Sequence, residues 1–460
     1  MRKIFGSKPL MLIVATALTA TFTGISAGAA GDVVISEANF PNEVFRSYIS
    51  ENFDTDSNGT LSKDEIVAAT EICFYTSGVT NLDGIEYFTE LTKLECANDE
   101  LTSIDVSKNT ALEYLDVGNN QLTNIDVSKN TALVYLDVST NRLTSIDVSK
   151  NTALESLRID ANQITSIDVS KNTALKLLNA GSNEFTSIDL SKNTALESLI
   201  LERSLLTSVD VSNNTKLDYL DIMFSQFTSI DVSKNVALGY FYADYNQLTS
   251  IDVSNNTALE LLSIGNNQLK SIDVSKNTAL KKLGVYQNQL TSLDIEGTVV
   301  DGLRAYMNSF TLHTASLNEL RTYGFDPEKA SNWTGATYDY ATNSLKDITA
   351  DTVTYVYDVG NDSSVTFTLV IDIYETPQNI RITAGDSKVT MTWDKVTGAT
   401  KYAVYMLENG AYVCKSNAVT STSYTFTGLA NGTKYSFKVK AYVNGTWKTA
   451  SNMVVAIPFA

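Results

Sequence analysis

A nine-residue segment, Ile-Asp-Val-Ser-Lys-Asn-Thr-Ala-Leu, starts at Ile104 and recurs in register at constant intervals of 21 residues until Ile272. There are nine copies, and five of them are identical over all nine residues. A fixed period of this length predicts a solenoid, in which each unit buries its apolar face only against its neighbours. Solenoids present long exposed surfaces, so the repeats indicate a binding function without naming the partner.

The repeats follow the leucine-rich pattern Leu-x-x-Leu-x-Leu-x-x-Asn-x-Leu, as in residues 112–122. This pattern predicts an α/β-type leucine-rich repeat solenoid, mostly β, with a parallel sheet on its concave face. We expect Asn120 and its equivalents to bond backbone groups at the bend, because buried backbone must be paired. We expect Asp105 and its equivalents to bond turn amides, and Ser107 and its equivalents to cap a short helical turn on the convex side. The eleven copies begin at Leu91, Leu112, Leu133, Leu154, Leu175, Leu196, Leu217, Leu238, Leu259, Leu280 and, one residue short, Val300.

The first 30 residues read as a secretory signal peptide. Arg2, Lys3 and Lys8 precede a short apolar run over 10–20, and Ala27-Gly-Ala29 fits a small-residue cleavage site. The apolar run is too short to span a membrane as a helix. The sequence therefore predicts a secreted, extracellular protein.

The formal net charge is −18. Nucleic acids and anionic membranes are bound by basic patches, so this acidity argues against both as partners. It is compatible with calcium, basic partners or neutral glycans. The three cysteines, Cys73, Cys96 and Cys414, do not describe a disulfide framework or a zinc site. Cys96 stands where other repeats carry Val or Ile, so we expect it to be buried.

Residues 54–65 form a complete twelve-residue EF-hand loop between predicted helices at 42–53 and 62–72. Asp or Asn occupies positions 1, 3 and 5, Gly59 makes the turn at position 6, and Glu65 is the bidentate ligand at position 12. The sequence therefore predicts a structural calcium site, and a loop that keeps its shape without metal is the alternative. The predicted Ca²⁺ ligands are Asp54, Asp56, Asn58, Thr60, Ser62 and Glu65.

Positions 3, 5, 7 and 8 of each repeat are predicted to point outward on the concave face, because side chains alternate along a strand. Most repeats carry small or polar groups there, whereas the middle repeats carry aromatics among acids, and two of them replace the structural Asn by Ser204 and Ser225. Such aromatics are typical of binding hot spots or sugar stacking, although strand propensity alone also favours Tyr. The predicted partner-binding residues are Tyr219, Asp221, Phe224, Tyr240, Tyr242, Asp244 and Tyr245, and Tyr286 and Tyr306 continue the trend.

The sequence does not predict an enzyme. It contains one histidine, His313, and no His-containing triad, metalloprotease motif or nucleophile elbow. Carboxylates are plentiful, so composition leaves a glycosidase pair open. The aspartate column that starts at Asp105, however, repeats in register, which indicates a role in the fold rather than one active site.

These features together resemble bacterial secreted or surface leucine-rich repeat proteins of the internalin-like kind. In that group an EF-hand-like helical cap precedes the repeats and an immunoglobulin-like domain follows them. Residues 79–85 look like the opening repeat of the group, and later repeats are similar to those of secreted proteins of gut Firmicutes. Two alternating stretches, 352–357 and 365–371, flank a hairpin signal at Gly360 where the immunoglobulin-like cap is expected.

The C-terminal segment resembles a fibronectin type III domain. Residues 389–393 give a strand with a core Trp, and residues 402–405 give the next strand. Residues 429–439 match the Leu-to-Tyr spacing at which the hydroxyl of Tyr435 bonds back at a strand corner. The predicted domains are a signal peptide (1–30), an EF-hand-like helical cap (31–78), the leucine-rich repeat solenoid (79–310), an Ig-like β cap (311–375) and the fibronectin type III domain (376–460).

The resemblance implies recognition or adhesion, with a protein of a host or neighbouring cell bound on the concave face. The alternative is a non-catalytic carbohydrate-binding accessory protein of a glycan-using system, with the same aromatics stacking on sugar rings. Adhesive members of the group usually carry a wall anchor, and the sequence shows no evident sorting signal. We therefore expect a secreted protein, or one held at the cell surface through partners.

Overall fold

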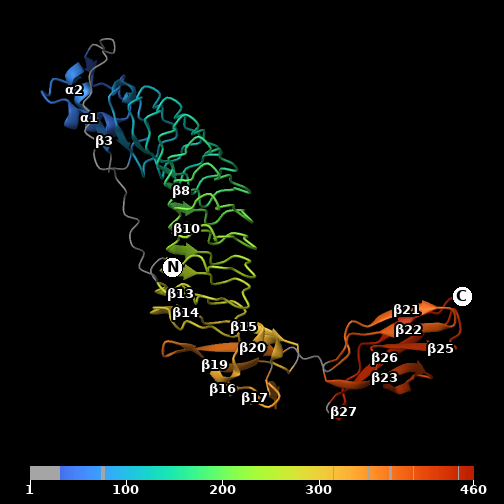
Figure 1. Ribbon diagram of the computed structural model, residues 1–460. Helices are drawn as coiled ribbons and strands as arrows, with labels where there is room; N and C mark the ends of the chain where they lie inside the picture. The colour runs from blue at the N-terminus through green and yellow to red at the C-terminus, as the bar shows by residue number, and fades with distance from the viewer. Residues whose placement is uncertain are drawn as a thin grey trace.

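The protein, seen in a computed structural model, is a curved solenoid with helices at its N-terminal end and β domains beyond its C-terminal end (Figure 1). The predicted signal peptide lies outside the described residues. Within the part of the chain that the structure describes, no helix is both long and apolar enough to cross a membrane. The structure describes residues 32–73, 78–313, 315–350, 352–371, 376–396, 398–443 and 445–460.

One sheet of twelve parallel strands lines the concave side of the solenoid (Figure 1). Neighbouring strands pair in register, so equivalent side chains of successive repeats lie side by side, about 4.8 Å apart. The central residue of nearly every strand is buried in the core, and its two neighbours face the concave surface. The strands are β3 (Glu71–Cys73), β4 (Lys93–Glu95), β5 (Tyr114–Asp116), β6 (Tyr135–Asp137), β7 (Ser156–Arg158), β8 (Leu177–Asn179), β9 (Ser198–Ile200), β10 (Tyr219–Asp221), β11 (Tyr240–Tyr242), β12 (Leu261–Ser263), β13 (Lys282–Gly284) and β14 (Gly302–Arg304).

Two predicted columns of backbone-bonding side chains are confirmed. The side chain of Asn120 donates to the Cys96 carbonyl at 2.9 Å and accepts the Leu101 N–H at 3.0 Å. Asp105 accepts the Ser107 N–H at 2.9 Å, and the equivalent bond recurs in the later repeats. The expectation that Ser107 caps a helical turn is wrong, because this segment forms a tight turn that the Asp side chain closes.

A second column of buried asparagines, which the sequence analysis did not assign, ties each repeat to the one before it. Asn109 is fully buried, and its side chain donates to the carbonyls of Ile85 and Phe88 at 2.8 and 2.9 Å. The later copies donate in the same way to carbonyls 24 and 21 residues earlier. The signal for this column is the last residue of each Ser-Lys-Asn or Ser-Asn-Asn triplet. The column consists of Asn109, Asn130, Asn151, Asn172, Asn193, Asn214, Asn235, Asn256 and Asn277.

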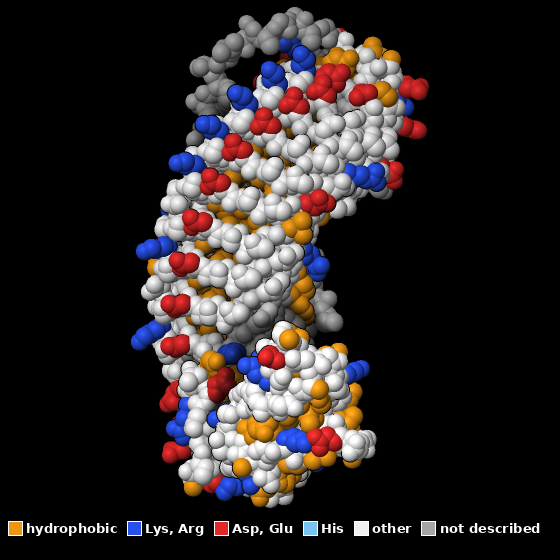
Figure 2. Space-filling model, turned by 90° about the vertical axis from the view of Figure 1, so that its right-hand side faces the viewer, with side chains coloured by type: hydrophobic (Ala, Val, Ile, Leu, Met, Phe, Trp, Pro, Cys, Tyr) orange, Lys and Arg blue, Asp and Glu red, His pale blue; other side chains and the backbone are white. Residues whose placement is uncertain are grey.

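The convex face is uniform along the solenoid. Figure 2 shows a column of acidic side chains beside a column of basic ones. The repeated Asp105 and Lys108 positions are both exposed, and the bond from Ser107 lowers the pKa of Asp105. Because the convex surface barely changes between repeats, features that distinguish one repeat from another are found mainly on the concave side.

The N-terminal cap closes the first end of the sheet with two helices. α1 (Glu43–Phe53) begins after Asn42, whose side chain accepts the Phe45 N–H at 2.8 Å. α2 (Lys63–Ala68) is shorter than predicted, because Ile72 belongs to strand β3 and is buried in the core. The cap therefore supplies the first strand of the sheet.

The C-terminal cap shares its hydrophobic core with the solenoid. The predicted hairpin at Gly360 is present as the antiparallel pairing of β19 (Thr352–Gly360) with β20 (Ser363–Ile371). Tyr355 crosses from this hairpin to the solenoid, where its hydroxyl donates to the Thr291 carbonyl at 2.5 Å. The cap contains β15 (Ser309–Leu312), β16 (Ala330–Thr334), β17 (Thr337–Asp339), β18 (Ser344–Lys346), β19 (Thr352–Gly360), β20 (Ser363–Ile371), α3 (Asn318–Arg321) and the 3₁₀ turn η2 (Pro327–Lys329).

The last domain has two antiparallel sheets around a separate core. Trp393 and Tyr402 pack edge to face in this core, with ring centroids 5.3 Å apart. The predicted corner bond is confirmed, because the Tyr435 hydroxyl accepts the Ala430 N–H at 3.0 Å. The strands are β21 (Arg381–Gly385), β22 (Lys388–Thr392), β23 (Ala399–Glu408), β24 (Ala411–Val419), β25 (Ser423–Thr427), β26 (Tyr435–Val443), β27 (Thr446–Trp447) and β28 (Val454–Ala456).

Candidate functional site

The acidic loop between α1 and α2 is wound around its own carboxylates. Asp54, which is 7% exposed, accepts the N–H groups of Asn58 and Gly59 at 3.0 and 2.9 Å. The side-chain oxygen of Asn58 in turn accepts the Thr60 N–H at 2.8 Å. The positive φ angles of Ser57 (57°) and Gly59 (80°) reverse the chain at this point. The loop therefore folds back on the Asp54 carboxylate.

Glu65 closes the loop from the first turn of α2. One of its carboxylate oxygens accepts the Thr55 N–H at 2.7 Å and the other accepts the Ser62 N–H at 2.8 Å. Ser62 and Glu65 also form a capping box for α2. The hydrogen bonds from Thr55, first of all from its hydroxyl, lower the pKa of Glu65 to about 2, so its carboxylate is ionised at neutral pH.

The donor set of the loop fits a hard divalent cation. Carboxylate oxygens of Asp54, Asp56 and Glu65 lie within 4.8 Å of one another. Among the described residues, none of these three groups is paired with a Lys or Arg side chain. Calcium is bound in proteins by six to eight oxygen ligands, and a flexible loop of carboxylates, amides and carbonyls can supply them.

The loop is braced by a short β pairing. β1 (Val33–Val34) pairs antiparallel with β2 (Thr60–Leu61), with Val33 opposite Leu61. Leu61, at position 8 of the loop, is fully buried, and the Ile35 N–H donates to the Gly59 carbonyl at 3.0 Å. The shape of the loop is therefore coupled to the core of the cap.

The predicted concave residues form a compact square on two adjacent strands. Tyr219 and Asp221 project from β10, and Tyr240 and Tyr242 occupy the paired positions on β11. The ring centroid of Tyr219 lies 5.5 Å from that of Tyr242 and 6.4 Å from that of Tyr240. We call these four residues the tyrosine–aspartate square.

The two acidic residues among the predicted partner-binding residues, Asp221 and Asp244, are buried. Asp221 and Asp244 are only 5% and 3% exposed, whereas they had been expected to stand outward with the tyrosines. Burial desolvates both carboxyl groups, which raises the pKa of Asp221 to about 7 and also raises the pKa of Asp244. Asp244 is held by the Gly265 N–H at 2.8 Å and by the side chains of Ser263 and Tyr286.

A second aromatic group runs along the rim of the concave face at position 8. The Arg203 guanidinium lies 4.6 Å from the ring centroid of Phe224, and that ring stacks on Tyr245 at 4.4 Å with planes 13° apart. Phe224 and Tyr245 are 39% and 44% exposed. We call Arg203, Phe224 and Tyr245 the rim stack.

The rim stack occupies a conformation that such residues rarely adopt. The position is left-handed in every repeat, with φ of 56° at Arg203, 53° at Phe224 and 58° at Tyr245. Asn fills it in several other repeats, as at Asn119 and Asn266, although Gln287 and Met307 occupy it near the C-terminal end, and Asn tolerates this region far better than an aromatic residue does. Local conformational preference therefore does not explain the aromatic residues, and strained positions of this kind cluster at functional sites.

The bend beneath the rim stack is also weakened. Ser204 and Ser225 replace the bend asparagine, and their hydroxyls lie 3.2 Å from each other. The Ser225 hydroxyl reaches the Leu201 carbonyl at only 3.5 Å, against 2.8 Å for Asn246 and the Ile222 carbonyl in the next repeat. The longest hydrogen bonds at the bend thus lie next to the exposed Phe224 ring.

Aromatic pairs also occur outside the predicted site. Tyr114 and Tyr135 stack at 4.2 Å near the N-terminal end of the sheet. Tyr286 and Tyr306 stack at 5.3 Å near its C-terminal end, where Gly265 leaves room for the Tyr286 ring. The sequence signal for both pairs is the recurrence of Tyr at one position of adjacent repeats.

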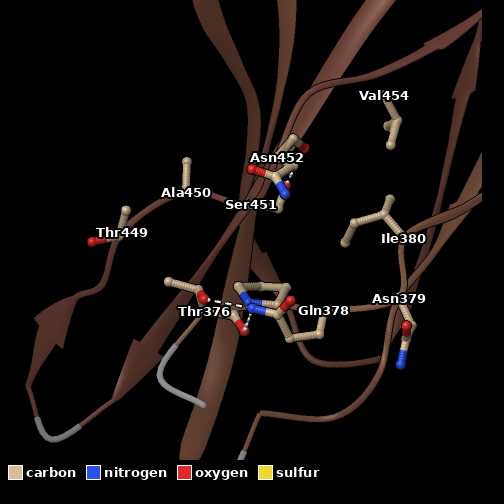
Figure 3. Close-up of a pocket in the computed structure, with 10 residues that line it drawn as sticks. Thr376, Gln378, Asn379, Ile380, Thr449, Ala450, Ser451, Asn452 and Val454 are labelled. Carbon is tan, nitrogen blue, oxygen red and sulfur yellow. Dashed lines mark hydrogen bonds between the residues drawn. The ribbon is translucent and has the colours of Figure 1, made fainter.

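Two cavities involve described residues of the last domain, and one of about 260 Å³ is lined by His313, Asp394 and Lys395 among others. A cavity of about 390 Å³ in the last domain is lined by uncharged residues, among them Thr376, Gln378 and Ser451 (Figure 3). Its only hydrogen bonds drawn in Figure 3 are local ones, such as the 2.8 Å bond from Gln378 to the Thr376 hydroxyl. This lining contains no His, Cys, Asp, Glu or Lys side chain that could act as a general acid or base.

Comparisons with known proteins match a family model to the last domain and a solved structure to a larger part of the chain. The model of the fibronectin type III domain family matches residues 375–457. An internalin (InlF) of Listeria monocytogenes superposes on 61% of this chain and 86% of its own, with a TM-score of 0.56 and 25% sequence identity.

Relatives found by sequence are matched only locally. Internalin J of Listeria monocytogenes is 32% identical over 71 residues, which are 15% of this chain and 8% of that protein. An amylopullulanase of Thermoanaerobacterium saccharolyticum is 35% identical over 69 residues, which are 15% of this chain and 5% of that enzyme. The chain therefore spans only a small part of the curated relatives that it matches.

Proposed function

Since the chain combines an internalin-like leucine-rich repeat solenoid with a C-terminal fibronectin type III domain, we propose that it is a secreted recognition protein. Its partner is a protein of a host or neighbouring cell. The partner is bound on the concave face, by the tyrosine–aspartate square and the rim stack. The protein acts without catalysis.

The observation that carries this proposal is the position of the aromatic groups. Phe224 and Tyr245 stand exposed at left-handed positions where Asn is the favourable residue. The bend asparagines that would follow Arg203 and Phe224 are replaced by Ser204 and Ser225. Here the sequence departs from its own repeat at a cost in local stability, and it exposes large aromatic side chains at the same place. This combination is typical of a binding site.

The geometry favours a protein over a glycan as the partner. Sugar rings stack on an open aromatic face, whereas both faces of Phe224 are occupied, by the Arg203 guanidinium and by the Tyr245 ring. What the rim stack offers is ring edges and an apolar ridge, which suit packing against side chains of a protein.

We also assign calcium to the loop at 54–65. The assignment is supported by the three clustered carboxylates, by the absence of a paired cation among the described residues, and by the pairing of β1 with β2 that couples the loop to the cap. When bound, the ion would neutralise the carboxylates of Asp54, Asp56 and Glu65. Its role is structural, since the loop lies in the cap and not on the concave sheet.

Selection from a random peptide display library tests the proposed function. The full chain is immobilised in calcium buffer, and the enriched peptides are measured against wild type and a Tyr240→Ala/Tyr242→Ala variant. The proposal expects at least a tenfold loss of affinity in the variant. Equal affinity of the peptides for both proteins would exclude the concave face as the binding site. Strong binding to an array of neutral glycans would favour a carbohydrate as the partner.

A further inference from the structure

The tyrosine–aspartate square contains a buried carboxylate that lacks a counter-ion. Asp221 is 5% exposed, and one of its oxygens, Oδ1, accepts the Met223 N–H at 3.0 Å. Among the described residues, no donor lies within hydrogen-bond distance of the other oxygen, Oδ2. The charges that act on Asp221 are those of Glu202 and Asp244, and both are negative.

Tyrosine rings surround this carboxylate. Tyr219 lies two residues before Asp221 on the same face of β10, and Tyr242 is its paired residue on β11. Burial, and after it the charge of Asp221, raises the pKa of both hydroxyls. Two electron-rich rings with centroids 5.5 Å apart and a carboxylate at their base are the elements of a cation pocket.

We infer that this pocket receives an arginine side chain of the bound protein, whose guanidinium lies against the rings of Tyr219 and Tyr242 and pairs with Oδ2 of Asp221. Arginine fits better than lysine, because its planar group stacks on aromatic faces and is more weakly hydrated. The surrounding field agrees, since Glu202 and Asp244 add negative charge and the chain as a whole carries −18. The inference rests on the proposed function and specifies the chemistry of the partner.

Binding of a tetra-arginine peptide, acetylated and amidated at its ends, tests this pocket. Calorimetric titration into the full chain, in calcium and 150 mM salt, is compared between wild type and Asp221→Asn. The substitution keeps the shape and the Met223 bond but removes the charge, and it is expected to weaken binding at least tenfold. A Tyr219→Leu variant, which keeps apolar bulk without the ring, is expected to lose a similar factor. A tetra-lysine peptide is expected to bind several-fold more weakly than tetra-arginine.

Asp126→Asn on the convex face is the matched control, since it removes one exposed carboxylate far from the pocket. It is expected to change the affinity less than twofold. The inference is overturned if wild type does not bind tetra-arginine, if Asp221→Asn binds within twofold of wild type, or if Asp126→Asn weakens binding as strongly. If tyrosine substitutions abolish binding of selected peptides while Asp221→Asn does not, the pocket fails and the concave binding face stands. If neither affects them, both proposals fail.

Discussion

The rings of Phe224 and Tyr245 stack with centroids 4.4 Å apart and planes 13° from parallel, from two successive left-handed backbone positions. Repeat periodicity brings them together, because residues 21 apart lie side by side in the solenoid. The stack compensates part of the strain that each ring incurs at its own position. Its exposed edges are the feature that the partner is proposed to contact.

Replacing Tyr245 by Asn separates stability from binding. Asn is favoured in the left-handed region, so we expect Tyr245→Asn to leave the free energy of unfolding within about 0.5 kcal/mol of wild type. Binding of selected peptides is expected to weaken at least fivefold. Thermal melts and titrations on the same preparation check both. Asn266→Ala, at the equivalent position of the next repeat, is the comparison; if it weakens binding as much as Tyr245→Asn, the rim stack has no special role.

The buried carboxylate of Asp221 makes stability depend on pH. Burial raises its pKa to about 7, whereas an unfolded Asp titrates near about 3.9. Between these values the folded state binds more protons than the unfolded state, so the contribution of Asp221 to stability falls as the pH rises from about 4 to about 7. We expect Asp221→Asn to raise the melting temperature at pH 8 by more than at pH 4. If Asp221→Asn raises the melting temperature equally at both pH values, the pKa of Asp221 is not raised by burial in the folded state.

Calcium is expected to stabilise the cap with one ion per chain. Extracellular EF-hand sites bind with dissociation constants of roughly 10⁻⁴ to 10⁻³ M, and we expect the loop to fall in this range. Glu65→Gln should weaken binding at least tenfold and abolish the calcium-dependent shift in melting temperature, while Gln still completes the capping box. Asp64→Asn, one residue earlier in the same helix turn, should change neither. Calorimetric titration of calcium into the chelated proteins measures the dissociation constants of wild type and the variants. If wild type shows no heat of binding, the loop keeps its shape without metal.

The second column of buried asparagines, to which Asn172 belongs, is expected to carry much of the stability of the solenoid. Asn172 donates to the carbonyls of Val148 and Asn151 at 3.0 and 2.8 Å from a fully buried position. Asn172→Ala removes both bonds, although the two carbonyls still accept the N–H groups of Asn151 and Leu154 at 3.0 and 3.2 Å. It should cost about 1–3 kcal/mol, since each lost hydrogen bond contributes about 0.5–1.5 kcal/mol. Lys171→Ala, at the exposed neighbouring residue, should change stability by less than about 0.5 kcal/mol. Chemical denaturation measures the difference.

Repeat period predicted the architecture well, because each repeat packs on its neighbour in the same way. The apolar positions, the bend represented by Asn120 and the turn closed by Asp105 follow from pattern alone. The boundary of α2 did not, since Ile72 suits a helix or a strand equally and only the parallel pairing of β3 with β4 decides. Local pattern gives the type of element, whereas tertiary contacts set its end.

The sequence predicted which residues lie together in the candidate site, but it did not predict their burial or their backbone conformation. Alternation placed Tyr219, Asp221 and Tyr242 on one face, as the structure does. It could not show that Asp221 is buried beneath its neighbours, because burial on a concave surface depends on the size of side chains in adjacent repeats. The left-handed backbone at Phe224 and Tyr245 was equally invisible, since the strained residue gives no local signal of its conformation.

The most direct test of concave recognition is the dissociation constant of one selected peptide for three forms of the full chain. These are wild type, the Tyr219→Ala/Tyr240→Ala variant, and the Tyr114→Ala/Tyr135→Ala variant, which removes a stacked tyrosine pair from the same sheet. The account predicts at least a tenfold weaker constant for the first variant and less than a twofold change for the second. Equal constants for all three forms would contradict it.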